Sequence, residues 1–253
     1  MVAYLGRGAK RSSRAVALHR PSAIRPGPRR DAIRPQASVG SAVCACLEVR
    51  MADVSTVLLT GVPGVGKSSV ARWLEERCDA RYRWVPFGEL IRQALNELAG
   101  SRVEEAQLRR EPTSLVTEAV LEHATRQLVA MCASSARRVV VIVDSHAVSQ
   151  DQFGFRSTPD GPSYFKALRY DAIVQLVLPG QEILDRTPVG TGGRQARSGV
   201  DLDFHSSLQL MVSTFYAAMS ECPLFVVSAD GAVSEVAARV DGVLTRVVGD
   251  RIS

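Results

Sequence analysis

The chain has 253 residues, 46% of them hydrophobic, which is enough for one good-sized domain with a buried sheet but not for two. No apolar run approaches the roughly 18–20 residues that a membrane span needs, so the sequence predicts a soluble protein without a membrane partner. The net charge of +5 arises in residues 1–50, where ten Lys or Arg face only two acids. The remainder is slightly acidic, which argues against nucleic-acid binding by the folded part.

Cysteine usage favours a reducing compartment. The five cysteines form an odd set, and a Cys-x-Cys pair without further ligands nearby is a poor zinc site. We therefore expect neither a disulfide framework nor bound zinc, and a cytoplasmic location. The five are Cys44, Cys46, Cys78, Cys132 and Cys222.

Residues 1–50 combine arginine-rich patches and prolines with Gly, Ser and Ala, without a helical or strand period, and are expected to form a basic disordered extension. Met51 precedes a polar lead-in and an apolar strand, so it is one candidate for the true start. The alternatives are a solvated tail without a specific role, and a segment for targeting or RNA contact. The folded domain is expected to span 51–253.

From residue 54 onward, short apolar segments alternate with longer helical patterns, which is typical of a parallel sheet covered on both faces. The predicted fold is a three-layer α/β sandwich with five parallel strands. Strands are predicted at 54–60, 81–86, 138–144, 171–178 and 224–228. Helices are predicted at 66–77, 88–99, 113–134, 202–220 and 232–247, with a further short helix after the fourth strand.

A glycine-rich segment between the first strand and the first helix matches the pattern G-x-x-x-x-G-K-[ST] without a mismatch. Glycines let successive backbone N–H groups converge on phosphate oxygens, and the following helix directs its positive end at the same anion. The pattern predicts an ATP-binding loop and a bound Mg²⁺, with Lys67 on the β- and γ-phosphates and Ser68 as a metal ligand. Only three lysines occur in the chain, which makes Lys67 informative. The predicted ATP-binding residues are Gly61, Val62, Pro63, Gly64, Val65, Gly66, Lys67, Ser68 and Ser69.

Asp144 ends the third predicted strand, at the edge where ligand crevices form in α/β proteins. We expect it to hold the magnesium ion through water or to contact the second substrate; a turn-capping role is the alternative. His146 follows two residues later, and a lone histidine there is interpreted as hydrogen-bonded structure and not as a catalytic group.

Residues 186–201 are rich in glycine and arginine, which favours a short mobile lid whose arginines neutralise the transferring phosphoryl group. Arg186, Arg194 and Arg197 are the catalytic candidates there; a solvated loop is the alternative. Arg109 and its neighbour Arg110 are candidates for binding a monophosphate acceptor, although a solvated helix face explains them almost as well.

Several stretches over residues 54–247 together resemble the archaeal-type adenylate kinases. They are residues 58–66, 85–88, 108–110 and 143–146, with 171–174 and 182–184. The resemblance implies a P-loop fold, reversible phosphoryl transfer from Mg-ATP to AMP, and an acceptor site bordered by Phe87, Gly88 and Arg109. It also implies that Arg186, Arg194 and Arg197 serve the lid.

The chain departs from that family at Asp185, where a basic residue is usual, and at residues 210–214, which lack the family's asparagine and arginine. Two further functions therefore stay open. One is a kinase of another small acceptor. The other is a slow ATPase that acts as a nucleotide-dependent switch for a protein or RNA partner. The sequence does not indicate an oligomeric state.

Overall fold

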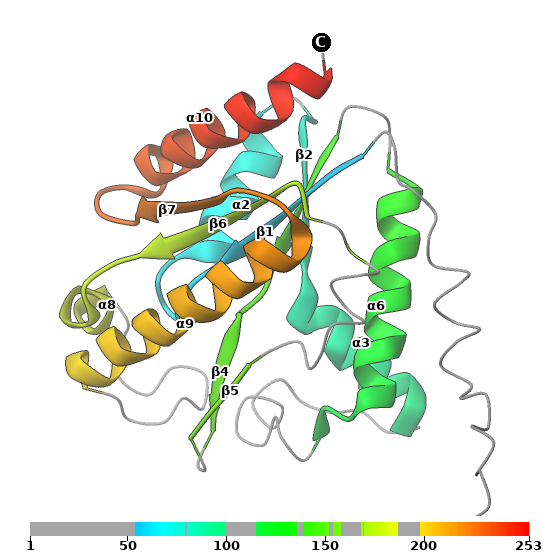
Figure 1. Cartoon of the computed structure of the whole chain (residues 1–253), viewed down its shortest axis with the longest axis horizontal. Helices are drawn as coiled ribbons and strands as arrows, with labels where there is room; N and C mark the ends of the chain where they lie inside the picture. Colours follow the sequence, from blue (N-terminus) through cyan, green and yellow to red (C-terminus); the bar gives the residue numbers. More distant parts are fainter. Residues whose placement is uncertain are drawn as a thin grey trace, which may run out of the picture. The chain divides into compact units, whose positions relative to one another are not determined.

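A central sheet of five parallel strands organises the computed structural model, which describes residues 54–78, 80–99, 115–135, 139–151, 154–157, 168, 170–186 and 198–252 (Figure 1). The sheet order is β2-β3-β1-β6-β7. The strands are β1 (Ser55–Thr60), β2 (Tyr82–Pro86), β3 (Val140–Asp144), β6 (Ala172–Val177) and β7 (Leu224–Ser228). All five predicted strands are thus confirmed, and their carboxyl ends share one edge.

Both faces of the sheet are buried, because alternate residues of each central strand point to opposite sides. On one face Val57 and Leu59 join a core with α2 (Lys67–Arg77) and α10 (Val233–Ile252). On the other face Leu58 joins α3 (Phe87–Ala99), α6 (Glu118–Ala133) and part of α9 (Gly199–Ser220). Figure 1 shows α2 and α10 together on one side and α3 beside α6 on the other. The predicted three-layer sandwich is confirmed.

Capping residues explain where two helices differ from their predicted bounds. Thr117 accepts a hydrogen bond from the Val120 N–H, so α6 begins at Glu118 and not at residue 113. Ser198 and Asp201 form a reciprocal capping box, so α9 begins at Gly199. Residues 199–201, predicted as the end of the lid, are therefore helical.

Two elements complete the described part of the chain. The short helix predicted after the fourth strand is α8 (Gly180–Arg186). A hairpin formed by β4 (Val148–Asp151) and β5 (Gly154–Ser157) was not predicted, because each strand has only four residues. None of the described helices combines the length and the apolar character needed to cross a membrane.

The chain divides into Met1–Ser38 and Val39–Ser253, and every described residue belongs to the second unit. The predicted basic extension, residues 1–50, lies outside the described residues.

Candidate functional site

The loop between β1 and α2 has the backbone geometry that its glycines permit. Gly61, Gly64 and Gly66 all have positive φ, at 144°, 95° and 106°. Gly66 is also the left-handed N-cap of α2, and no side chain caps this helix end. The first N–H groups of α2 therefore face the loop and form a positive end suited to an anion.

Lys67, the first residue of α2, is buried and turns back over this loop. Its ammonium donates to the carbonyl oxygens of Gly61, at 3.0 Å, and Val62, at 3.4 Å. These carbonyls partly offset the cost of burying the charge. The ammonium is thus held within the loop, beside the anion-binding N–H groups.

His146 Nδ1 lies 3.2 Å from the Lys67 ammonium and 2.9 Å from the Gly61 carbonyl oxygen. Ammonium groups only donate and carbonyl oxygens only accept, so Nδ1 serves one of the two according to its tautomer. The prediction that His146 forms hydrogen bonds agrees with this geometry. The sequence did not indicate that the ring touches the loop lysine.

Ser68 and Asp144 meet across the sheet edge. The Ser68 hydroxyl donates to Asp144 Oδ2 at 2.5 Å, and the carboxylate is largely buried. A hydroxyl and a carboxylate oxygen are the hard ligands that Mg²⁺ prefers, and Mg²⁺ in nucleotide sites takes few protein ligands because water and phosphate complete its shell. The pair fits the predicted ion, and its metal-binding role stays a prediction.

Strand register explains why Asp144 is close to so many predicted residues. Asp144 pairs with Leu59 on β1 and with Pro86 on β2, so three strands end beside it. Phe87 and Gly88, the predicted acceptor-binding residues, follow Pro86 directly and begin α3. The Phe87 ring is buried in the core, whereas Gly88 is exposed at the start of the helix. The site lies where the order reverses between β1 and β3, as expected for α/β ligand sites.

Gln209 on α9 is a buried residue of this region that the sequence analysis missed. Its Oε1 accepts from the N–H groups of Ala147, at 2.8 Å, and Val148, at 3.1 Å. Its Nε2 donates to the carbonyl oxygens of Val148, at 3.0 Å, and Gly61, at 3.3 Å. One amide thus joins α9, the segment after His146 and the first residue of the loop. Gln209 is one of several polar residues on α9, so no signal in the sequence singled it out.

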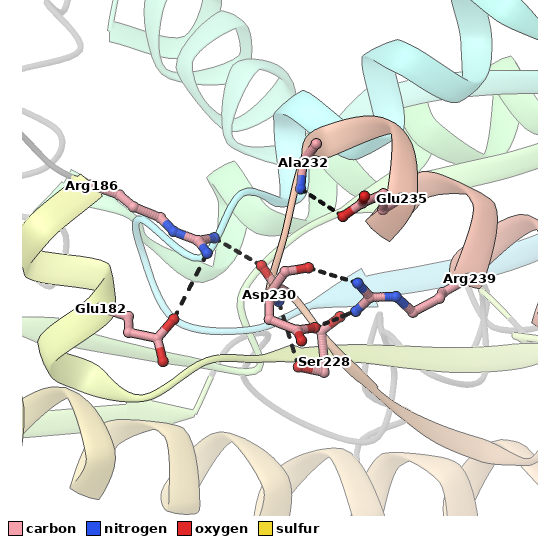
Figure 2. Close-up of polar contacts among 8 residues, drawn as sticks. Glu182, Arg186, Ser228, Asp230, Ala232, Glu235 and Arg239 are labelled. Atoms are coloured by element: carbon pink, nitrogen blue, oxygen red, sulfur yellow. Dashed lines mark hydrogen bonds and ion pairs between the residues drawn. The ribbon is translucent and has the colours of Figure 1, made fainter.

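The structure places Arg186 in a different cluster, shown in Figure 2. Its guanidinium donates to the Ala229 carbonyl at 2.8 Å and lies 3.8 Å from Glu182, so it joins the end of α8 to the turn after β7. Arg239 fixes the same turn through Ser228 and Asp230. Hydrogen bonds from Ser228 and Arg239 hold the pKa of the Asp230 carboxyl below its usual range. In this arrangement Arg186 serves the turn, and its predicted catalytic role is untested.

Three predicted site residues, Arg109, Arg194 and Arg197, lie outside the described residues. The helices on either side of residues 187–197 are described, however, and their first turns lie close together. A Cβ on Gly180 would be 2.1 Å from the Gly199 carbonyl oxygen, and Asp203 Oδ1 accepts the Gly180 N–H at 2.7 Å. The helices before and after residues 187–197 therefore meet through backbone contact.

A parallel sheet whose central strand leads through such a loop to a lysine-bearing helix defines the class of P-loop nucleotide-binding proteins. A family model described as AAA domain matches residues 60–201. The chain belongs to this AAA domain family.

Curated relatives at the sequence level are adenylate kinases. That of Pyrococcus furiosus is 29% identical over 141 residues, covering 56% of this chain and 64% of the relative. That of Pyrococcus abyssi is 28% identical over 141 residues, with the same coverage. The match thus spans less than two thirds of the length of these relatives.

Two solved structures are also similar. A gluconokinase from Sinorhizobium meliloti 1021 has a TM-score of 0.42 and 16% identity, over 78% of this chain and 94% of that chain. A shikimate kinase from Acinetobacter baumannii, in complex with shikimate, has a TM-score of 0.47 and 13% identity, over 83% and 99%.

Proposed function

We propose that this protein is a phosphotransferase that moves the γ-phosphoryl group of ATP to a nucleoside monophosphate, with AMP as the acceptor. The observation that carries the proposal is the convergence of Lys67, Ser68 and Asp144 at one sheet edge, with Ser68 2.5 Å from Asp144. The partial similarity to adenylate kinases supports AMP as the acceptor.

The loop residues bind and orient ATP in this proposal. Backbone N–H groups of the loop and of the α2 end hold the phosphates, and Lys67 leaves the Gly61 and Val62 carbonyls to contact phosphate oxygens. His146 Nδ1, released from Lys67, can then donate to the Gly61 carbonyl and keep the loop in place. Binding therefore exchanges internal hydrogen bonds for phosphate contacts.

Ser68 and Asp144 would hold magnesium, which supplies charge neutralisation on the phosphates when it is bound. An oxygen of the acceptor phosphate attacks the γ-phosphorus while the bond to the β-phosphate oxygen breaks, so ADP leaves and AMP becomes ADP. The attacking oxygen is already anionic and needs no protein base. Catalysis then depends on positioning and charge, which are the contributions that the loop can make.

The test is a coupled assay of ADP production by the full chain with Mg-ATP, comparing no acceptor with AMP, the other nucleoside monophosphates and a panel of small alcohols. We expect strong stimulation by AMP. Lys67→Ala should lower the turnover by about 10²-fold or more, because one preorganised charge at the phosphates is lost. Arg77→Ala is the matched control, since it removes an exposed positive charge from the other end of α2.

Three outcomes would contradict the proposal. Stimulation by an alcohol or another monophosphate, but not by AMP, would assign a different acceptor to the same site. Slow ATP hydrolysis at a rate that no acceptor changes would favour the ATPase switch. Full activity of Lys67→Ala would show that the loop lysine takes no part in the reaction.

A further inference from the structure

Helix α9 buries polar side chains and exposes apolar ones, which is the reverse of the usual arrangement on a surface helix. The face toward the protein carries buried polar side chains, among them His205, Gln209 and Ser213. The opposite face carries exposed apolar side chains: Val200 is 78% exposed, Met211 69%, Phe215 59%, Phe204 55% and Met219 42%. No Asp, Glu, Lys or Arg occurs from residue 204 to residue 220. A helix face of this kind is typical of a surface that another apolar surface covers.

These five exposed side chains and the half-buried Leu208 form one stripe. We call it the α9 stripe, and it consists of Val200, Phe204, Leu208, Met211, Phe215 and Met219. At 3.6 residues per turn, these six positions fall within an arc of about 100° along a helix about 33 Å long. They form two rows with a spacing of four residues, 200–204–208 and 211–215–219.

The stripe is large enough to form most of an interface. Phe155 of the β4–β5 hairpin extends it, because its ring packs edge-on against Phe204 with centroids 5.5 Å apart and stays 36% exposed. With side chains of about 150–250 Å² each, these exposed fractions amount to roughly 600 Å² of apolar surface per copy. A stable interface needs about 800 Å² per partner, and the uncharged residues beside the stripe can supply the rest.

The order of the residues in the stripe identifies the partner. The stripe is symmetric about its centre between residues 209 and 210: Val200 mirrors Met219, Phe204 mirrors Phe215, and Leu208 mirrors Met211. When two copies pack antiparallel about a two-fold axis at that centre, each large apolar side chain lies opposite another. A two-fold interface requires a self-complementary surface of this kind. We propose that the protein is a homodimer in which the α9 stripes of two copies pack against each other in antiparallel orientation.

The first test is the oligomeric state of the full chain, by sedimentation velocity from low to high micromolar concentration. We expect twice the 27.3 kDa mass of the chain. Phe215→Glu should weaken association by about tenfold or more, because it buries a charge in an apolar contact. Leu98→Glu is the matched control: Leu98 on α3 is 52% exposed but lies outside the stripe, so this variant should stay dimeric.

The second test uses complementary charges and depends on the antiparallel orientation. Phe204→Lys and Phe215→Glu should each weaken self-association. When the two variants are mixed, a heterodimer should form, because the new lysine of one copy faces the new glutamate of the other while the remaining Phe204 and Phe215 still pair. Circular dichroism of each variant confirms that it is folded.

Four results would overturn the proposal. The first is a wild-type monomer at high micromolar concentration, and the second is a dimer that Phe215→Glu leaves intact. The third is a monomer whose Met211 and Met219 resist oxidation by hydrogen peroxide, which would show that another segment of the same chain covers the stripe. Two folded variants that associate no better mixed than alone would exclude the antiparallel pairing.

Discussion

At the scale of single residues, position 61 requires glycine for two independent reasons. Its φ of 144° is a conformation that other residues rarely adopt. A Cβ there would also lie 2.6 Å from the carbonyl oxygen of Leu176, a backbone atom of the neighbouring strand β6. The residue that opens the phosphate loop is thus fixed by both backbone conformation and space.

We therefore expect Gly61→Ala to lower the free energy of unfolding by about 2–4 kcal/mol, since strain and a backbone clash add. Urea denaturation followed by circular dichroism measures this change. Gly242→Ala is the control, because a Cβ at Gly242 on α10 meets nothing within 4 Å and should stabilise the helix by about 0.5–1 kcal/mol. Equal stability of the two variants would contradict the assigned loop geometry.

The sequence indicated the loop residues well, because their chemistry depends on local spacing. A glycine at each special φ and a lysine at the start of the helix are adjacent in the chain, so one pattern contains them all. Gln209 could not be found in this way. Its four backbone partners lie about sixty residues or more away, and only the packing of α9 brings them together.

At the scale of elements, the amide of Gln209 connects α9 with the phosphate loop. Replacing it by leucine leaves the buried Val148 N–H without this acceptor and the Val148 carbonyl without this donor, and each such loss costs about 1–3 kcal/mol. The Ala147 N–H keeps the Thr60 hydroxyl oxygen as an acceptor, at 3.1 Å. Gln209→Leu should destabilise the protein by about 3–5 kcal/mol. It should also weaken ATP binding, since the Gly61 carbonyl loses a donor.

Calorimetric binding of ATP and urea denaturation together measure these effects. Thr214→Ala is the control on the same helix, because the exposed Thr214 hydroxyl donates only to its own helix, at the Leu210 carbonyl. Its stability should change by less than about 0.5 kcal/mol. If Gln209→Leu behaved like Thr214→Ala, the amide would not be holding the segment after His146.

The strands of the main sheet were easier to predict than the helix ends and the hairpin. Buried parallel strands are continuous apolar runs, and all five were found within a few residues of their observed bounds. The start of α9 depends on the Ser198–Asp201 capping box, which lies in a glycine-rich stretch typical of a loop. The β4–β5 hairpin has only four residues in each strand, which is too short for a period of two to be recognised in the sequence.

At the scale of the whole molecule, α9 connects the phosphate loop with an exposed apolar surface. Its inner face holds the Gly61 carbonyl and the segment after His146, and its outer face is the α9 stripe. The helix also begins directly after residues 187–197. Contacts on the outer face and the geometry of the site therefore depend on the position of one rigid element.

The buried thiol of Cys132 and the half-buried thiol of Cys222 make the stability of the fold depend on pH in the alkaline range. Burial raises the pKa of Cys132 to about 11 and that of Cys222 to about 11, from an ordinary value of 9.0, and the Asp171 carboxylate adds to the effect on Cys222. In the unfolded chain both thiols lose their protons near pH 9, whereas in the folded protein they keep them until about pH 11. The unfolded state therefore binds fewer protons in this window, and stability falls as pH rises.

We expect the thermal midpoint of the wild type to be insensitive to these thiols below pH 9 and to fall by several degrees from pH 9 to pH 11. A double variant, Cys132→Ala with Cys222→Ala, should start from a lower midpoint because it loses buried contacts, but its midpoint should fall less over the same range. The measurement is a series of thermal melts in reducing buffer at constant ionic strength. The difference between the two proteins isolates the thiols from the other groups that titrate in alkali, including Tyr82, whose pKa is raised chiefly by burial. Parallel curves for wild type and double variant would mean that neither thiol resists ionisation in the folded state.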